Sequence, residues 1–381
     1  MKKRKELSFG FFSWNENSGF SFSYSLRHYS IQHLIFANMV KTVLIYTDVE
    51  PDDLIAIWYL VRFYHSFNMS LKFYVEVSES TVVAYKVPYT KLFMQLLQNA
   101  YPSVIESWTV HAGVASDKEF AGPVIPIDCK TILPDIEGIE YGGIERVVSF
   151  APPRQILSYA HHDFFKNVDL HMYGSFNMRT LNATPEMVGT LTSMFRCVYW
   201  VEGFTFLGGE NSFSSVTMPA LAEEFSNMGT KPTLGPILKF IQNAMIAWND
   251  FIIEECKQTV FSCENELAEV HGIGAGDALF VPTPALEKLM GKLHRNKKIV
   301  ENITACRECQ CVLADPIVVY GMFHPHIYMQ GKLTGFTGAG YPIFAPIDTE
   351  NGEASNLFVV KPDRVQENRE GLIKNLMQLF Q

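Results

Sequence analysis

The chain has 381 residues, of which 48% are hydrophobic and 19% are charged, and its formal net charge is −9. This length suits one large α/β domain or two ordinary ones, and the composition excludes a wholly disordered chain. The negative balance argues against a general nucleic-acid-binding surface or binding to an acidic membrane. No apolar run approaches the roughly 20 residues that a membrane-spanning helix needs, so we expect neither nucleic acid nor a membrane as partner.

Residues 1–38 differ in composition from the rest of the chain. They begin with a basic stretch and continue with many Ser, Phe, Asn and Gly residues, without the apolar core of a signal peptide. Met39 stands directly before the first strand-like run. We therefore expect an N-terminal extension, residues 1–38, followed by a single domain, residues 39–381.

The acidic loop that follows this first strand-like run is the most informative feature of the chain. The apolar run Val43–Thr47 ends at a loop that holds Asp48, Asp52 and Asp53, and apolar residues at helical spacing follow. Open α/β sheets bind their ligands at the carboxyl ends of such strands. Three carboxylates this close repel one another unless a proton or a cation lies among them, and calcium prefers oxygen ligands of this kind. The alternative, that Asp52 or Asp53 only caps the helix, stays open.

Strand-like runs and helical patterns alternate along the chain. The strand-like runs are Val43–Thr47, Leu71–Val77, Ser107–Ala112, Arg146–Phe150, Val168–Tyr173 and Cys197–Leu207. The helical patterns are Tyr89–Asn99, Arg154–Phe164, Glu186–Phe195, residues 225–262 and Arg364–Phe380. This alternation predicts the α/β class, with a mostly parallel open sheet flanked by helices.

A Gly-rich turn between His271 and Pro282 holds a further candidate carboxylate, Asp277. Glycines allow a backbone to approach a ligand closely, whereas a helix N-cap at Asp277 explains the same residues without a ligand. Glu210 and Asn211 follow the sixth strand-like run, and we expect them at the same edge of the sheet as the acidic loop. A plain turn is the alternative for these two residues.

The seven cysteines do not form a disulfide framework in a chain of this length. Their odd number and loose spacing suit a reducing compartment, so we expect a cytoplasmic protein. The one tight cluster, Cys306, Cys309 and Cys311, lacks a fourth zinc ligand at a usable spacing. We expect ordinary thiols there, and a zinc site completed by distant histidines is the alternative.

The segment from Thr47 to Asp53 resembles the aspartate signature of the calcium-dependent nucleoside hydrolases of the inosine-uridine-preferring type, Asp-x-Asp-Pro-Gly-x-Asp-Asp. It keeps the last three aspartates in register, with Tyr46 in place of the first Asp and Glu50 in place of the Gly. A weaker likeness extends over roughly residues 40–381. The resemblance implies a nucleoside-hydrolase-like fold, and a hydrolase that cleaves the N-glycosidic bond of ribonucleosides with a calcium-bound water as nucleophile.

The resemblance also implies roles for single residues. Calcium would be held by three carboxylates and one backbone carbonyl, those of Asp48, Asp53, Asp277 and Arg154. Asp48 would also accept the proton of the attacking water. The sugar would be bound by Asp52 and Asn177, with Glu210 and Asn211 as possible additions. The implied cofactor is Ca²⁺ and the implied partner is a small-molecule nucleoside; assembly into a homo-oligomer stays open.

Several departures from the family pattern keep a second function open. Besides the change at Tyr46, Gly276 stands where the family has a His that is often assigned to protonating the leaving base, and Val77–Ser80 stands where it has a sugar-binding Asn. These changes favour a nucleoside-hydrolase-like protein that binds ribosyl ligands and has lost or altered catalysis. The retained aspartates favour the enzyme.

Overall fold

The structure is a computed structural model. It describes residues 40–78, 83–113, 141–174, 185–201, 232–273, 284–305, 314–336, 342–348, 352, 354–361 and 365–380. The extension, residues 1–38, and the cysteine cluster, residues 306–311, lie outside this part of the chain, so the predictions made for them stay predictions. In the described residues no helix is long and apolar enough to cross a membrane.

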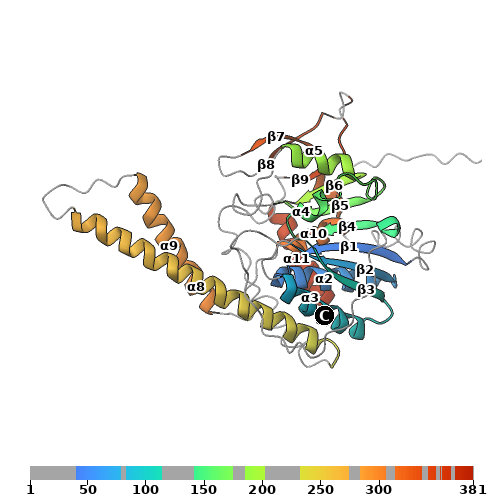
Figure 1. Cartoon of the computed structure of the whole chain (residues 1–381), viewed down its shortest axis with the longest axis horizontal. Coiled ribbons are helices and arrows are strands. Elements are labelled where there is room, and N and C mark those ends of the chain that lie inside the picture. Colours follow the sequence, from blue (N-terminus) through green and yellow to red (C-terminus); the bar gives the residue numbers. More distant parts are fainter. Residues whose placement is uncertain are drawn as a thin grey trace, which may run out of the picture. The chain divides into compact units, whose positions relative to one another are not determined.

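One sheet organises the described part of the chain, and its nine strands follow the order β3-β2-β1-β4-β5-β6-β9-β7-β8 (Figure 1). The strands are β1 (Lys41–Thr47), β2 (Leu71–Val77), β3 (Ile105–Ala112), β4 (Arg146–Ser149), β5 (Asp169–Tyr173), β6 (Cys197–Val201), β7 (Tyr328–Phe336), β8 (Pro342–Pro346) and β9 (Leu357–Val360). The first six strands and β9 pair in parallel, whereas β7 pairs antiparallel with β8 and β9. The predicted α/β class with a mostly parallel sheet is confirmed.

Helices cover both faces of this sheet. They are α2 (Pro51–Ser66), α3 (Val83–Ala100), α4 (Arg154–Leu157), α5 (Pro185–Met194), α8 (Gly235–Ile273), α9 (Pro284–Ala305), α10 (Asp315–Phe323) and α11 (Val365–Phe380), with single 3₁₀ turns at Tyr141–Gly143 and Pro325–Ile327. Residues of α2, α3, α8, α10 and α11 share one hydrophobic cluster, and residues of α4 and α5 share the other. Strand residues alternate between the two, so that Ile45 joins the first cluster and Tyr46 the second.

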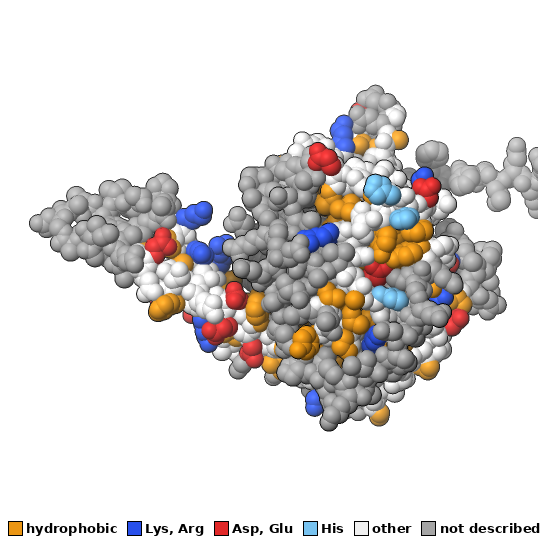
Figure 2. All heavy atoms as spheres, viewed as in Figure 1, with side chains coloured by type: hydrophobic (Ala, Val, Ile, Leu, Met, Phe, Trp, Pro, Cys, Tyr) orange, Lys and Arg blue, Asp and Glu red, His pale blue; other side chains and the backbone are white. Residues whose placement is uncertain are grey.

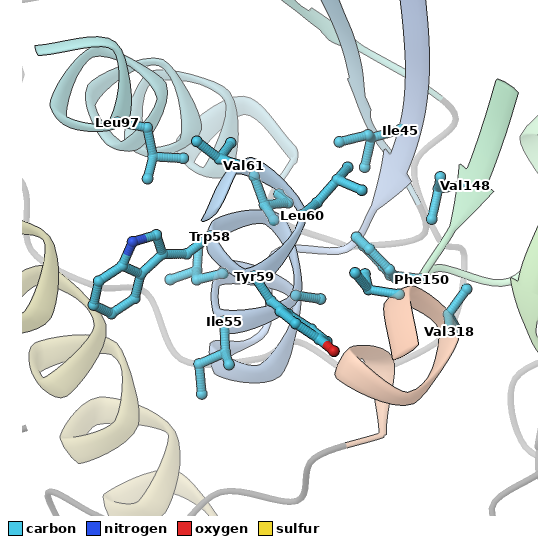
Figure 3. Packing of buried hydrophobic residues seen from close by; sticks show 14 of the residues in the cluster. Ile45, Ile55, Trp58, Tyr59, Leu60, Val61, Leu97, Val148, Phe150 and Val318 are labelled. Atoms are coloured by element: carbon cyan, nitrogen blue, oxygen red, sulfur yellow. The ribbon is translucent and has the colours of Figure 1, made fainter. Parts of the chain in front are cut away.

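Helix α2, which follows the acidic loop, is deeply buried over most of its length. Its residues Ile55, Trp58 and Leu60 are fully buried, and they pack between α3, α8 and strand β1 (Figure 3). The Trp58 indole Nε1 donates a hydrogen bond of 3.0 Å to the Tyr101 hydroxyl, which satisfies the one polar atom of this side chain. A helix with so little freedom fixes the position of the carboxylates at its first turn.

The helix predicted at residues 154–164 is wrong in its length. Helix α4 ends at Leu157, and tight turns follow, in which the Tyr159 amide bonds the Ile156 carbonyl at 3.0 Å and the His162 amide bonds the Tyr159 carbonyl at 2.9 Å. These turns bring Phe165 into the core and the Tyr159 hydroxyl to Tyr141. Tertiary contacts therefore override the helical spacing of the sequence.

Helix α8 has two differently packed parts. Its first part belongs to the main core, where Phe240 stacks on Tyr89 and Phe93 of α3. Its later part pairs with α9, and Lys297 forms an ion pair of 2.7 Å with Glu264 (Figure 1). Figure 2 shows charged side chains of both signs on this helical pair. The pair is thus an α-hairpin joined to the α/β core through the first part of α8.

Candidate functional site

The acidic loop lies at the carboxyl end of β1, as predicted. Helix α2 begins at Pro51, so Asp52 and Asp53 lie in its first turn. Asp53 is fully buried, and one of its oxygens, Oδ2, accepts a hydrogen bond from the Glu50 amide in a capping box. The capping alternative is therefore correct for one oxygen of Asp53. Its other oxygen, Oδ1, is buried and receives no donor.

The backbone of this loop is strained at Val49. Its φ is +60°, in the left-handed region that β-branched residues rarely adopt, and its amide donates a hydrogen bond of 3.0 Å to the Thr47 hydroxyl. Such a conformation costs about 1–3 kcal/mol and persists only where surrounding contacts impose it. The strained backbone adjoins Asp48, where strand β1 gives way to the loop.

A fourth aspartate, Asp315, joins the loop from a distant part of the sequence. It is the first residue of α10, is followed by Pro316, and is only 5% exposed. Hydrogen bonding between Asp52 and the side chain and backbone of Asp315 shows that the two residues are in direct contact. The structure therefore brings together three predicted carboxylates and one that sequence reasoning missed.

Helices α2 and α10 achieve this contact by lying side by side in the same direction. Their last turns meet where the ring of Phe63 stacks on that of Phe323, and their first turns meet at Asp52 and Asp315. Both helix N-termini consequently point at the same small region. Each helix carries a partial positive charge at that end, which favours carboxylates or a bound anion there.

The carboxylates shift one another's protonation. Burial, and then the charge of Asp48, raises the pKa of Asp52 to about 7. Burial also raises the pKa of Asp48, of Asp53 and of Asp315, and for the last two the neighbouring aspartates add to the rise. Asp48 hydrogen-bonds to Asp53, as Asp52 does to Asp315. Because an ionised carboxylate only accepts hydrogen bonds, each pair needs a shared proton or a cation.

Lys86 of α3 is the one described cation whose charge acts on this cluster. Its ammonium group is buried and donates a hydrogen bond to the backbone carbonyl of Asp48. The positive charge of Lys86 lowers the pKa of Asp48 and of Glu50, against the larger effect of burial. One ammonium group cannot balance four ionised aspartates and an ionised Glu50, so either protons or a further cation must neutralise the rest.

Arg154, whose carbonyl was predicted to bind the metal, lies at the start of α4. The segment that leads into this helix lies against the end of β1, because the amides of Phe150 and Ala151 donate to the Tyr46 carbonyl at 2.9 and 3.4 Å. The Arg154 carbonyl accepts the Ser158 amide at 3.1 Å, which engages one of its lone pairs within the helix. The other predicted site residues, Asp277, Asn177, Glu210 and Asn211, lie outside the described residues, and their roles stay predictions.

The donor set matches a hard divalent cation in chemistry and charge. Carboxylate oxygens are the preferred ligands of calcium, and the orphaned Oδ1 of Asp53 is the kind of buried acceptor that a cation satisfies. Among the described residues, however, no three His, Cys, Asp or Glu side chains are arranged as a metal-binding group. The agreement with a calcium site therefore rests on the chemical type and the charge of the oxygen donors, and not on their arrangement.

Sequence reasoning missed Asp315 and Lys86 for different reasons. Asp315-Pro316 precedes the apolar residues Ile317, Val318 and Val319, much as Glu50-Pro51 precedes α2. That likeness between two helix starts was a usable signal. Lys86 carries no such signal, because it lies within a helix and reaches the loop only through the packing of α3.

No protein-family model matches the chain, and no curated protein matches its sequence. Among solved structures it is similar to the purine-preferring ribonucleoside hydrolase from Gardnerella vaginalis, with 14% identity and a TM-score of 0.47 over 89% of this chain and 99% of that one. An inosine-guanosine nucleoside hydrolase shares 13% identity with a TM-score of 0.48, over 89% of this chain and 98% of that one. The type III effector XopQ, complexed with adenosine diphosphate ribose, shares 12% identity with a TM-score of 0.45, over 95% and 100%. Likeness at this level carries no weight for the activity of this chain.

Proposed function

We propose that the buried aspartates form the active site of a hydrolase that cleaves the N-glycosidic bond of ribonucleosides with the help of bound calcium. One observation carries the proposal: at the carboxyl end of β1, Asp48 hydrogen-bonds to Asp53 and Asp52 to Asp315, and burial together with the charge of Asp48 raises the pKa of the other three, with Lys86 as the one described cation that acts on the cluster. Burying carboxylates in this number is costly unless a ligand or a proton compensates. Such perturbed clusters are typical of functional sites.

Asp48 is the residue that we assign to proton transfer. It is partly exposed, whereas Asp53 and Asp315 are buried, so water and a substrate reach Asp48 more readily. The Lys86 charge favours the ionised form of Asp48, and only that form accepts a proton from an attacking water. The hydrogen bond from Lys86 to the Asp48 carbonyl also fixes the backbone at this position.

Asp52, Asp53 and Asp315 have holding roles in this proposal. Asp53 would offer its orphaned Oδ1 to the cation, while its Oδ2 remains bound to the Glu50 amide. Asp52 would accept a hydrogen bond from a ribose hydroxyl and orient the sugar. Asp315 would supply the further carboxylate that the resemblance assigns to Asp277. When bound, calcium lowers the pKa of a coordinated water and fixes its position.

A ribosyl-binding protein without catalysis is the second candidate. The residue before Asp315 is Ala314 and the residue before Asp277 is Gly276, so neither position supplies the His of the family's His-Asp pair. Without an acid to protonate the leaving base, ordinary nucleosides are poor substrates. The same aspartates would still bind a ribose and a cation.

Turnover of a nucleoside panel separates the two candidates. Purified protein is incubated with inosine, uridine and p-nitrophenyl riboside, with calcium, with a chelator, and after calcium is restored. We expect release of ribose that the chelator abolishes and calcium restores, fastest for p-nitrophenyl riboside because its leaving group needs no proton. If no substrate is cleaved but calorimetry detects binding of a nucleoside, the binding protein is the correct function. If no nucleoside is bound either, both candidates fail.

A further inference from the structure

A second group of buried polar residues lies on the α4 face of the sheet, outside the aspartate cluster. Its centre is Glu76 of β2, which is 3% exposed and pairs in register with Tyr46 of β1. Burial raises the pKa of Glu76 to about 7. Burying a carboxyl group costs free energy unless hydrogen bonds replace those it made to water. An apolar side chain would avoid this cost, so we expect a role here that only a polar group can fill.

Glu76 is the end point of a directed chain of hydrogen bonds. The Tyr141 hydroxyl oxygen lies 2.7 Å from Glu76 Oε1 and 2.7 Å from the Tyr159 hydroxyl oxygen, and Tyr159 also hydrogen-bonds to Glu76. Tyr159 in turn accepts from Gln155 Nε2 at 2.8 Å. Each hydroxyl has a single proton, and Tyr159 uses its proton toward Glu76, so its oxygen accepts from the Gln155 amide nitrogen. The chain thereby determines which end of the Gln155 amide is the nitrogen.

The opposite end of this chain lies beside the aspartate site. Gln155 belongs to the first turn of α4, directly after Arg154. Its Oε1 is only 3.0 Å from the place that a Cβ on Gly113 would occupy, and that place is also 3.0 Å from Ser78 Cβ. Gly113 and Ser78 immediately follow β3 and β2, so the Gln155 oxygen is held where these strands end. This is the edge of the sheet that carries Asp48.

We propose that Gln155 binds a hydroxyl group of the ribosyl ligand through its amide, and that Glu76 is a positioning residue that orients this amide through Tyr141 and Tyr159. The inference rests on the proposed ribosyl specificity of the aspartate site, and it holds for an enzyme and for a binding protein. A hydroxyl both donates and accepts, so an amide with one fixed orientation selects its position in the sugar. Gly113 leaves the room that this amide needs, since any larger side chain would press on it.

The test measures binding of pseudouridine and of its 2′-, 3′- and 5′-deoxy forms by calorimetry, because a C-nucleoside has no N-glycosidic bond to cleave. The variants are Gln155→Leu, Tyr159→Phe and the pair Glu76→Leu and Glu76→Gln. Tyr101→Phe is the matched control, because Tyr101 also accepts a buried hydrogen bond, from Trp58 on α2. Thermal melting of each variant shows whether it folds.

We expect Gln155→Leu to weaken pseudouridine binding about fivefold, the effect of one ordinary hydrogen bond. Binding of one deoxy form, the one that lacks the partner hydroxyl, should not change in this variant. Tyr159→Phe and Glu76→Leu should also weaken pseudouridine binding, by a smaller factor, and should leave the binding of the same deoxy form unchanged. Glu76→Gln should behave as the wild type, because its amide oxygen still accepts from Tyr141, and Tyr101→Phe should leave all four dissociation constants unchanged.

Uniform weakening for all four ligands in folded Gln155→Leu and Tyr159→Phe would overturn the inference, because the hydrogen-bond chain would then be merely structural. The inference would also fail if the control Tyr101→Phe changed the dissociation constants of the four ligands relative to one another. If the wild type binds none of the four ligands, the inference fails. Hydrolysis of the nucleoside panel is measured separately, so the inference can fail while the proposed function stands.

Discussion

At the scale of single residues, Asp48 has the environment of a proton acceptor. Its carboxyl group is in contact with Asp53, its carbonyl accepts from Lys86, and its side chain is less buried than the other aspartates of the cluster. We predict that Asp48→Asn, which keeps the shape and removes the charge, lowers kcat for p-nitrophenyl riboside by about 10²–10⁴. Steady-state kinetics with saturating calcium measures this effect. A variant within a factor of three of wild type would exclude Asp48 as the base.

The raised pKa of Asp52 predicts how pH and calcium act together on stability. In the unfolded chain this group titrates near its ordinary value of 3.8, whereas in the folded protein it holds its proton up to about pH 7. Between these two values the folded state binds the extra proton, so the free energy of unfolding falls as pH rises through this window. Calcium binds the ionised carboxylates and should oppose this fall.

The melting temperature at pH 5 and pH 8, with calcium and with a chelator, tests this linkage. We expect the chelated protein to melt at a lower temperature at pH 8 than at pH 5, and calcium to stabilise it more at pH 8. In Asp52→Asn, the difference between the melting temperatures at pH 5 and at pH 8 should become smaller. Equal stabilisation by calcium at both pH values would argue against binding at these carboxylates.

The sequence revealed Asp48, Asp52 and Asp53 because they are close together and follow an apolar run. Asp315 is far from them in sequence, and only the parallel packing of α10 on α2 brings it to Asp52. Single-chain patterns report local periodicity and turns, and they carry little information about which helices become neighbours. Lys86 escaped notice for the same reason.

At the scale of elements, the position of α10 decides whether Asp315 reaches the site. Gly321 lies in this helix against Tyr328, and a Cβ on Gly321 would lie 2.1 Å from the Tyr328 hydroxyl oxygen and 2.8 Å from its Cζ. Tyr328 is itself 6% exposed and packs on Tyr199, so it has little room to move. The small residue is therefore required by the close approach of α10 to β7.

We predict that Gly321→Ala destabilises the protein by about 1–3 kcal/mol, the usual cost of overfilling a packed core. Gly291→Ala is the matched control, because Gly291 lies in the middle of α9 with nothing within 4 Å of its added Cβ. That change should stabilise slightly, since Ala favours a helix by up to about 1 kcal/mol over Gly. Urea unfolding measures both. An unchanged midpoint for Gly321→Ala would show that α10 adjusts freely.

The elements themselves were predicted unequally well. Strand β2 has the predicted bounds, and the other five predicted strands overlap the observed ones, because each is a short apolar run that the sheet buries. None of the six predicted strand-like runs corresponds to β7, β8 or β9, and α4 was predicted too long. Pairing partners decide such cases more than the sequence of the element does.

At the scale of the whole molecule, the described residues from Val40 onward form both hydrophobic clusters and hold Asp48, Asp52, Asp53 and Asp315. We predict that a protein beginning at Met39 stays folded, melts within about 2 °C of the full chain and keeps its kcat, because residues 1–38 differ in composition from the rest of the chain and described residues from Val43 onward form both clusters. Differential scanning calorimetry and the riboside assay compare the two. Aggregation of the shorter protein would show that residues 1–38 pack as part of the domain.

The central claim is that Asp48, Asp52, Asp53 and Asp315 act as one site, and Asp315 tests it most directly because only the fold places it there. The measurement is calcium-dependent turnover of p-nitrophenyl riboside by wild type, Asp315→Asn and Asp169→Asn. Asp169 is the control, because it begins β5 at the amino end of that strand and pairs with the exposed Arg196 at 2.8 Å. We predict that Asp315→Asn loses more than about tenfold in kcat/KM and needs more calcium for half-maximal activity, whereas Asp169→Asn keeps wild-type values. Full activity and unchanged calcium dependence in a folded Asp315→Asn would contradict the account.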